Sequence, residues 1–373
     1  MRRSYIPRWK FTDSCGRPKA PPGALHLGCA HDVGAAHHHE HAAHPASRRE
    51  FLKTGVAVVG AAGLAAVVDP REVFAQGRVF PPPPPAVSPI AGLMDTHVHA
   101  APDVFGRGYD DDEVAALYKE RGLETVVLKN HVVSTADRAW LVRKHLPGIN
   151  VFGGIVLNSA VGGINPDAVN WMWRMQGGFG RVVWFPTFDA DNHVKHFKDA
   201  PEGIKVVGGD GKVLPQVREV LKICAQQKLV VQTGHMSAAE ALAVVEAGHE
   251  LGVDRMVVTH AQFEVVNMTP EQMKKAASMG AKLELCAVGT LMGPQAHLAW
   301  MTHWRHVKVE ETAAAVKEIG AGNFVLGTDL GQTGNPSPAD GLQLFVADLM
   351  KAGVGKDDVA KMGREVPGSL LMG

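Results

Sequence analysis

The stretch Asp95-Thr96-His97-Val98-His99 follows the apolar segment 90–94 and decides how the rest of the chain is interpreted. In an extended strand, residues two apart share a face, so His97 and His99 project together while Val98 points the other way. Two neutral imidazoles at this spacing make half of a divalent-metal site. An HxH pair alone is more often two surface histidines, so its meaning depends on ligands from later strands.

The composition is that of a soluble globular protein with a substantial core. Of the 373 residues, 46% are hydrophobic and 20% are charged,. The 38 Lys and Arg residues balance 38 Asp and Glu residues, so the composition shows no excess of positive charge that would attract nucleic acid or acidic lipid,. The four cysteines form neither a CxxC pair nor a dense disulfide framework, and they leave the compartment open,.

Three segments precede the expected folded domain. Residues 1–46 are a His-rich, low-complexity leader with too few apolar residues to pack, so we expect it to be disordered,. Residues 47–75 contain Ser47-Arg48-Arg49-Glu50-Phe51-Leu52-Lys53 and then an apolar run that is too short and too rich in Ala and Gly for a membrane span,. Residues 76–89 contain five consecutive prolines, which predict a stiff, extended linker,.

The S-R-R-x-F-L-K pattern in residues 47–75 resembles the twin-arginine export signal of bacteria, and Val73-Phe74-Ala75 offers a small-residue cleavage site,. The alternative, an amphipathic helix, fails because the apolar run has no polar face. The resemblance implies export by the twin-arginine machinery to the periplasm or the outside of the cell. Membrane contact is then expected only through the signal peptide.

From residue 90 onward, short β-rich runs alternate with helical patterns, which is typical of βα units around a parallel sheet. The expected strands are 90–99, 125–131, 150–158, 181–187, 229–235, 255–260, 281–286 and 323–329. Eight strands with intervening helices predict an α/β protein whose residues 90–373 form one closed (β/α)8 TIM barrel. A small insertion after the fourth strand, residues 189–213, contains a Gly-rich hairpin turn at 208–211,.

Local signals mark where several helices begin. Residues 110–113 are acidic and open a helix that Gly122 ends,. The segments 237–240 and 269–272 have capping-box spacing, with Ser or Thr followed three residues later by Glu or Gln,. These signals support the alternation of strands and helices.

The strongest candidate ligands all stand at the carboxyl ends of expected strands. They are His97 and His99 on the first strand, His235 on the fifth, His260 on the sixth and Asp329 on the eighth. In such barrels this rim carries the active site. A lone histidine there is more often structural, but four histidines and one aspartate on one rim favour a metal site.

These five positions resemble the amidohydrolase superfamily, whose pattern is HxH on strand one, His on strands five and six, and Asp on strand eight. The resemblance covers essentially all of residues 90–373, including an ending at 366–371 that is similar to the family's last helix. A phosphoesterase family of the PHP type shares the opening DxHxH. It has a different strand count and lacks the GTD-type eighth strand, so it ranks second.

The resemblance implies a divalent metal, with zinc as the first choice, present as one or two ions. Its ligands would be His97, His99, His235, His260 and Asp329. Two-metal relatives place a carboxylated Lys, or sometimes Glu, on strand four, whereas residues 185–189 contain no Lys. Lys129 at the end of the second strand is a candidate bridging ligand instead. A lysine that neutralises a rim carboxylate or binds substrate explains this residue equally well, so the number of ions stays open.

The ligand set also predicts the chemistry. A divalent ion lowers the pKa of bound water from about 15.7 to about 7. Asp329 would orient that water, accept its proton and deliver the proton to the leaving group, and His235 is a candidate for polarising the substrate oxygen. His131, Asn158 and Asp189 lie on the same rim and are candidates for substrate binding, against a structural or solvent-facing role.

Other rim residues carry less weight. Glu264 and Gln332 are expected to be structural or solvent-facing more often than functional. Cys286 is expected to be a packed thiol, because no adjacent base is evident.

Together these features predict an exported, metal-dependent hydrolase that uses metal-activated water on an amide, ester, lactone or phosphoester bond of a small molecule. The alternative enzyme is a metal-dependent decarboxylase or isomerase of the same superfamily. A non-catalytic metal- or ligand-binding barrel is the alternative outside enzymes, although such a protein has no need for Asp329 as a proton carrier. The expected partners are a small-molecule substrate and the export machinery, with no nucleic acid. The sequence leaves the substrate open.

Overall fold

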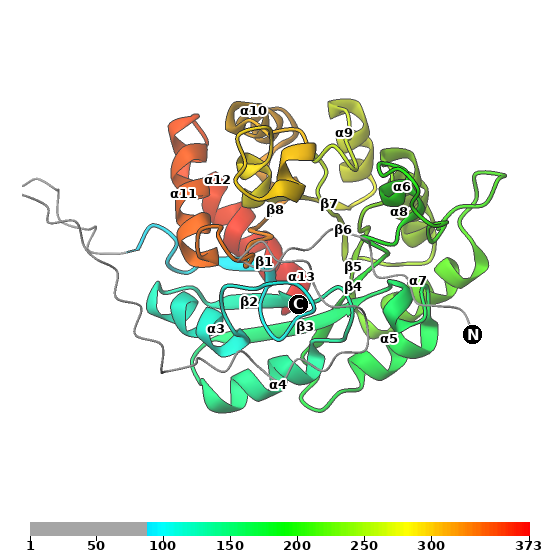
Figure 1. Ribbon diagram of the computed structural model, residues 1–373, viewed down its shortest axis with the longest axis horizontal. Coiled ribbons are helices and arrows are strands. Elements are labelled where there is room, and N and C mark those ends of the chain that lie inside the picture. The colour runs from blue at the N-terminus through cyan, green and yellow to red at the C-terminus, as the bar shows by residue number, and fades with distance from the viewer. Residues whose placement is uncertain (1–87) are drawn as a thin grey trace, which may run out of the picture. The chain divides into compact units, whose positions relative to one another are not determined.

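The computed structural model describes residues 88–373, and their architecture confirms the expected (β/α)8 barrel (Figure 1). Eight parallel strands form one sheet in the order of the chain. The strands are β1 Met94–His99, β2 Thr125–Lys129, β3 Asn150–Val156, β4 Gly180–Trp184, β5 Val230–Gln232, β6 Met256–Val258, β7 Lys282–Cys286 and β8 Phe324–Gly327. The carboxyl ends of parallel strands meet at one rim, so residues far apart in sequence come together there.

The last strand returns to the first one just beyond its own end. Asp329 N donates to His97 O and His99 N donates to Leu330 O, both at 2.8 Å. Val98 also forms a parallel bridge with Leu330. These contacts nearly close the barrel and place the segment after β8 beside the HxH pair of β1.

Helices alternate with the strands and surround them (Figure 1). They are α3 Asp111–Glu120, α4 Ala136–His145, α5 Pro166–Trp173, α6 Asp191–Val194, α7 Pro215–Gln227, α8 Ala238–Glu250, α9 Pro270–Ser278, α10 Val309–Ile319, α11 Pro338–Lys351, α12 Lys356–Ala360 and α13 Val366–Leu371. Short 3₁₀ turns are η1 Ser159–Val161, η2 Ala287–Leu291, η3 Ala299–His303 and η4 Ala321–Asn323, and η5 Lys361–Glu365 is a π-helical turn.

The predicted capping boxes are present. In α8, Ser237 Oγ accepts a hydrogen bond from Glu240 N at 3.3 Å, and in α9, Thr269 Oγ1 accepts one from Gln272 N at 3.3 Å. Each hydroxyl satisfies an N–H that the first turn of a helix leaves unpaired. The sequence therefore fixes these two helix starts locally, without help from the rest of the fold.

The insertion after β4 has the expected turn. Gly208 N donates to Lys212 O at 2.8 Å, and Val207 and Val213 form an antiparallel bridge around it. The same insertion contains the short helix α6, which the sequence analysis did not single out.

Several strands end earlier than predicted. The ranges 229–235, 255–260 and 323–329 were expected to be extended throughout, but β5, β6 and β8 end at residues 232, 258 and 327. The backbone turns away from the sheet there, with positive φ at Gly234 (68°), His260 (52°) and Asp329 (52°). Because a β-strand cannot contain that conformation, His235, His260 and Asp329 lie just after their strands, whereas His97 and His99 lie inside β1,.

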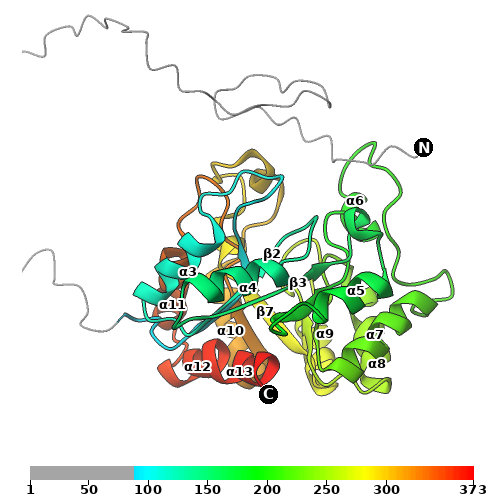
Figure 2. The ribbon, with the colours of Figure 1, turned by 90° about the horizontal axis from the view of Figure 1, so that it is seen from below.

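The two ends of the barrel interior are filled differently. Apolar side chains from the strands and from α13 form an inner cluster of Val127, Phe152, Val156, Val182, Trp184, Val230, Val257, Val325, Val366, Leu370 and Leu371. The cavity remaining between the strands and α13 is only about 10 Å³. Figure 2 shows α12 and α13 at one end of the barrel and α6 at the other. The C-terminal helix therefore plugs the amino end of the barrel and leaves the opposite rim for a site.

A second core cluster lies between the sheet and the surrounding helices, and it includes Tyr118, Val220 and Leu342. Within residues 88–373, no helix combines the length and apolar character needed to cross a membrane. The predicted leader, the export signal and residues 76–87 of the linker lie outside the described residues.

Candidate active site

The carboxyl-end rim brings four of the predicted ligands into one buried cluster. His97 and His99 come from β1, His260 follows β6 and Asp329 follows β8. The Nε2 atoms of His97 and His99 both lie 3.1 Å from Asp329 Oδ1, and His260 Nε2 lies 3.5 Å from Oδ2. Burial alone would raise the pKa of Asp329, but His97 and His260 hold it well below its usual value,. Three imidazoles therefore converge on one ionised carboxylate.

Two of these ligands have a left-handed backbone, which is uncommon for residues other than glycine,. His260 N donates to Glu284 Oε2 at 3.3 Å, and Asp329 N donates to His97 O at 2.8 Å. Such conformations cost of order 1–3 kcal/mol each and persist where the surroundings fix them. Here they direct both side chains inward over the end of the barrel.

Glu284 contacts both His97 and His260, and no motif in the sequence predicts its role. His97 Nδ1 and Gln232 Nε2 lie 3.0 Å and 3.3 Å from its Oε1. Burial would raise the pKa of Glu284, but His97, His260 and Lys129 hold it at about 2. The one signal in the sequence is a charged residue between Leu283 and Leu285 in a buried strand, which needs a partner inside the protein,.

Lys129 also joins the cluster. Its side chain is almost fully buried, and Nζ lies 2.8 Å from His97 Nε2. Burial lowers the pKa of Lys129, while Asp329 and Glu284 favour its charged form,. The structure thus places Lys129 beside a candidate metal ligand.

Arg107, in the loop after β1, restricts His99. Arg107 Nη2 lies 3.1 Å from His99 Nδ1, and Arg107 Nε donates to Asp103 Oδ2 at 2.8 Å. Because a guanidinium only donates, His99 Nδ1 accepts and the hydrogen of the neutral ring is on Nε2, facing Asp329,. His99 can therefore bind an ion through Nε2 only if the ring hydrogen shifts to Nδ1 and Arg107 moves away from that atom,.

His235 lies at the side of the cluster and is paired with a residue that the sequence analysis gave no role. Its Nδ1 is 2.9 Å from Nδ1 of His193 in α6, and its ring centroid is 5.4 Å from that of His260. Burial lowers the pKa of His235 well below its usual value and lowers that of His193 to about 3, so both rings are neutral. His193 Nε2 is buried without a hydrogen-bond partner. One neutral ring must therefore donate to the other.

The three candidate substrate-binding residues have different surroundings. His131 stacks on His99 with centroids 4.7 Å apart, and its Nδ1 lies 2.9 Å from Thr187 Oγ1. Asn158 Nδ2 donates to the same hydroxyl at 2.9 Å. Asp189 Oδ2 instead accepts the Ser159 N–H at 2.8 Å, which holds the loop after β3. His131 thus lies beside the cluster. Asn158 shares the Thr187 hydroxyl with His131, and Asp189 contacts a neighbouring loop.

The remaining rim residues have structural partners. Gln332 Nε2 donates to Asp329 O at 2.7 Å, and Glu264 Oε2 accepts the N–H of Arg305 at 2.7 Å. Cys286 is buried, and burial raises the pKa of its thiol well above the usual value. Its Sγ lies 4.0 Å from His97 Nδ1.

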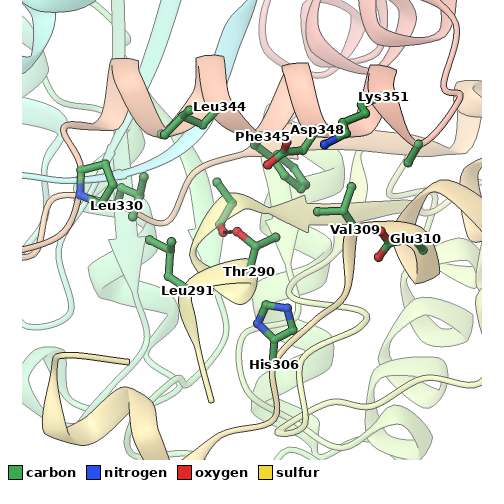
Figure 3. Close-up of a pocket in the computed structure, with 14 residues that line it drawn as sticks. Thr290, Leu291, His306, Val309, Glu310, Leu330, Leu344, Phe345, Asp348 and Lys351 are labelled. Atoms are coloured by element: carbon green, nitrogen blue, oxygen red, sulfur yellow. Dashed lines mark hydrogen bonds between the residues drawn. The ribbon is translucent and has the colours of Figure 1, made fainter. Parts of the chain in front are cut away.

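A larger cavity of about 650 Å³ lies elsewhere, between η2, α10 and α11 (Figure 3). Thr290, His306, Phe345 and Lys351 are among the side chains that line it. None of the candidate ligands does so, although Leu330 directly follows Asp329. Size alone would favour this cavity, but the convergent ionisable groups are at the rim.

The residues at the rim fit a divalent ion. Two groups of buried side chains each have ligand atoms within 4.8 Å of one another: His97, His99 and Asp329, and His97, His260, Glu284 and Cys286. Imidazole, carboxylate and thiolate are the ligands that Zn²⁺ and related ions use in proteins. The chemistry of the donor set therefore supports a metal centre at this end of the barrel.

The fold and this site define a parallel (β/α)8 barrel with a buried His/Asp/Glu cluster at its carboxyl rim. Residues 92–284 match the model of a family that is described as a family of unknown function, DUF6282, and the chain belongs to this family. The matched segment contains the candidate histidines and ends at Glu284, whereas Asp329 lies beyond it. No curated protein matches the chain.

Solved structures resemble the chain in fold. An amidohydrolase from Pseudomonas aeruginosa is 12% identical with a TM-score of 0.50, and the match covers 76% of this chain and 96% of that one. 2,6-Dihydroxybenzoate decarboxylase from Rhizobium is 13% identical with a TM-score of 0.50, covering 76% and 99%. Organophosphorus hydrolase from Deinococcus radiodurans is 15% identical with a TM-score of 0.50, covering 75% and 92%. At these identities the similarity establishes the barrel fold.

Proposed function

We propose that this protein is a metal-dependent hydrolase of the amidohydrolase superfamily that acts on a small molecule. The observation that carries the proposal is the convergence of the His97, His99 and His260 Nε2 atoms on Asp329, within 3.1–3.5 Å. The amidohydrolase and the organophosphorus hydrolase with the same fold support the class. His97, His260 and Asp329 would hold the ion, and His99 would join them once its ring hydrogen has shifted to Nδ1 and Arg107 has moved away,.

A bound divalent ion would supply a Lewis acid and lower the pKa of a water molecule. The side chains supply the remaining steps. Ionised Asp329 would orient a water molecule, accept its proton and pass the proton to the leaving group. The paired His235 and His193 can present one N–H toward a substrate oxygen, because only one of the two facing Nδ1 atoms carries a hydrogen,.

Two forms of Lys129, a free amine and a carbamate, would have different roles at the site. As an amine it donates to His97 Nε2 at 2.8 Å and would have to move when an ion binds there. As a carbamate, formed with CO₂ and loss of a proton, it would become an anionic ligand that bridges two ions. Native mass spectrometry distinguishes the roles, since the carbamate adds the mass of CO₂ and Lys129→Met removes it.

The decisive experiment combines metal analysis with turnover. We expect purified full-length protein to contain zinc or a similar ion and to hydrolyse at least one member of a panel of amides, lactones, esters and phosphoesters. Reaction in water enriched in oxygen-18 should place the label in the product. Metal-dependent turnover without the label would favour the decarboxylase or isomerase alternative, and metal binding without any turnover would favour a binding protein.

We also propose that residues 47–75 direct export by the twin-arginine route. The support is the S-R-R-x-F-L-K pattern with its following apolar run,. In a bacterial host, Arg48→Lys with Arg49→Lys should retain the protein in the cytoplasm with an uncleaved N-terminus. Unchanged fractionation of this double variant would contradict the proposal.

A further inference from the structure

The cluster offers two places for an ion that compete for the same histidines. His97 and His260 each place Nε2 near Asp329 and Nδ1 near Glu284, and Cys286 Sγ lies 4.0 Å from His97 Nδ1. We name these the outer group, with Asp329, and the inner group, with Glu284 and Cys286. Ligand atoms in the inner group also lie within 4.8 Å of one another, so distance alone does not exclude an ion there.

The two places exclude one another when the histidines are neutral. A neutral imidazole has one nitrogen with a lone pair and one nitrogen with a hydrogen. An ion in the outer group needs the lone pair on Nε2, and an ion in the inner group needs it on Nδ1. The positions of the ring hydrogens of His97 and His260 therefore decide which group binds the ion.

The neighbours of His97 fix its hydrogen from both sides. On one side, Nδ1 lies 3.0 Å from Glu284 Oε1, and a carboxylate only accepts,. On the other side, Nε2 lies 2.8 Å from Lys129 Nζ, which donates, and 3.1 Å from Asp329 Oδ1, which can only accept,. The contacts with Glu284 and Lys129 have the geometry of hydrogen bonds and place the hydrogen on Nδ1, which leaves the Nε2 lone pair for an ion beside Asp329.

Glu284 has the same effect on His260. Its Oε2 accepts the His260 backbone N–H at 3.3 Å and lies 3.4 Å from His260 Nδ1. That second contact has the distance but not the alignment of a hydrogen bond, and Nδ1 has no other partner. Asp329 Oδ2, 3.5 Å from Nε2, can also only accept, so a hydrogen on Nδ1 serves Glu284 and leaves the Nε2 lone pair for an ion beside Asp329,.

We propose that Glu284 is a positioning residue that holds the hydrogens of His97 and His260 on Nδ1, directs a divalent ion to the outer group with Asp329, and leaves Cys286 as an unligated thiol. This inference rests on the proposed metal-dependent function. It goes beyond that function by assigning the tautomer of two ligands to one buried carboxylate. Carboxylates that orient metal-binding histidines commonly change metal affinity by 10–100-fold.

Cobalt(II) tests the proposal because a thiolate ligand gives it an intense near-ultraviolet charge-transfer band. We expect the cobalt-loaded wild-type protein to show visible d–d bands and no thiolate band. Cys286→Ser should leave the spectrum and the affinity unchanged. Cys224→Ser is the matched control, since Cys224 is also a buried thiol but lies in α7. A thiolate band that disappears in Cys286→Ser and persists in Cys224→Ser would place the ion in the inner group and overturn the proposal.

A second arm tests Glu284 directly. Glu284→Gln should weaken cobalt binding about 10–100-fold, and Glu284→Asp, which keeps the carboxylate, should recover part of the affinity. Glu264→Gln, on the rim but bonded to Arg305, should have no effect. Affinity within about twofold of wild type in folded Glu284→Gln would contradict the positioning role.

The metal-free wild-type protein provides a readout that does not depend on any variant folding. Burial and Lys129 lower the pKa of His97, but Glu284 and Asp329 raise it above its usual value, so the spectrum is recorded at a pH high enough to leave both rings neutral. Nitrogen-15 NMR should then show His97 and His260 as Nδ1–H tautomers, and Nε2–H tautomers would overturn the proposal. Absence of cobalt or zinc binding by the wild-type protein would instead contradict the proposed function. The two failures are therefore distinguishable.

Discussion

The two ends of the barrel interior are equally buried but chemically opposite. At the amino end, Val127, Leu370 and their neighbours pack into an apolar plug. At the carboxyl end, Lys129, Glu284 and His97 are at most 1% exposed and form a network of ionisable groups. Val127 and Lys129 are two residues apart on β2 and share its inner face,. Two adjacent inward-facing positions of one strand therefore differ in kind. Val127 belongs to apolar packing that stabilises the barrel, whereas the burial of the Lys129 charge costs free energy of folding unless that charge is paired.

The two ends of the barrel are therefore expected to have different roles. Substitutions at the plug should reduce stability and spare activity, whereas substitutions at the rim should reduce activity and spare the fold. This is the general pattern for (β/α)8 enzymes, whose active sites lie at the carboxyl rim.

The largest expected effect is at the rim. Asp329→Asn should lower kcat about 10²–10⁴-fold, because the amide cannot accept the proton that the carboxylate takes. Steady-state kinetics with circular dichroism and metal analysis would measure this change. Asp199→Asn is the matched control, since Asp199 is exposed and also has a positive φ, which Asn tolerates,. Near-normal turnover by Asp329→Asn would refute its role as the base.

The next effect is at the plug. Leu370→Ala should lower the free energy of unfolding by about 2–5 kcal/mol, since it leaves a cavity where the described structure has only about 10 Å³,. Urea denaturation measures this loss, and kcat per folded molecule should stay the same. Met372→Ala, at a side chain that is 52% exposed, serves as the control. A loss below about 1 kcal/mol would show that α13 does not seal the barrel.

A pH effect of intermediate size should arise at Asp95, which accepts hydrogen bonds from the backbone N–H groups of His97 and Thr328 and from Tyr118. Burial raises its pKa from 3.8 to about 6, despite those hydrogen bonds. The folded state then binds more protons than the unfolded state between these pH values, so stability falls as pH rises from about 4 to about 6. The contribution is at most about 3 kcal/mol.

Asp95→Asn should remove this part of the pH dependence. Urea denaturation of metal-free protein at a series of pH values would measure it, with wild type beside the variant. An equally steep fall of stability with pH in Asp95→Asn would assign the effect to other groups.

The smallest effect is expected at the large cavity between η2, α10 and α11. Lys351→Ala should change kcat less than about twofold and stability by less than about 0.5 kcal/mol, because it is a surface substitution outside the cluster,. His306→Ala, on the opposite wall of that cavity, should behave in the same way (Figure 3). A loss of activity comparable with that of Asp329→Asn would relocate the site to this cavity.

The barrel itself could be predicted from the sequence, because both of its signals are local. Alternating apolar periods define the strands and helices, and capping residues such as Ser237 and Thr269 fix helix starts within one turn,. The rule that parallel strands end at one rim then brings His97, His260 and Asp329 together without any knowledge of distances.

The partners of those residues could not be predicted in this way. In the sequence Glu284 is a charged residue between two apolar residues of a strand, and its role depends on contacts with His97 of β1 and with His260, which follows β6. His193 lies on a four-residue helix inside an insertion, where no periodicity indicates a direction. The predicted strand ends were also too long, because the positive φ of His260 and Asp329 is imposed by contacts with other strands.

The sequence by itself determined the element order, the rim and the types of ligand, because these follow from patterns within a few residues. Only the tertiary structure decided which nitrogen of each imidazole faces Asp329, which carboxylate lies behind it, and that Arg107 and Lys129 approach from either side. The physical reason is that hydrogen-bond direction depends on atoms brought together from distant segments. Sequence spacing specifies the face of a strand but not the partner across the barrel.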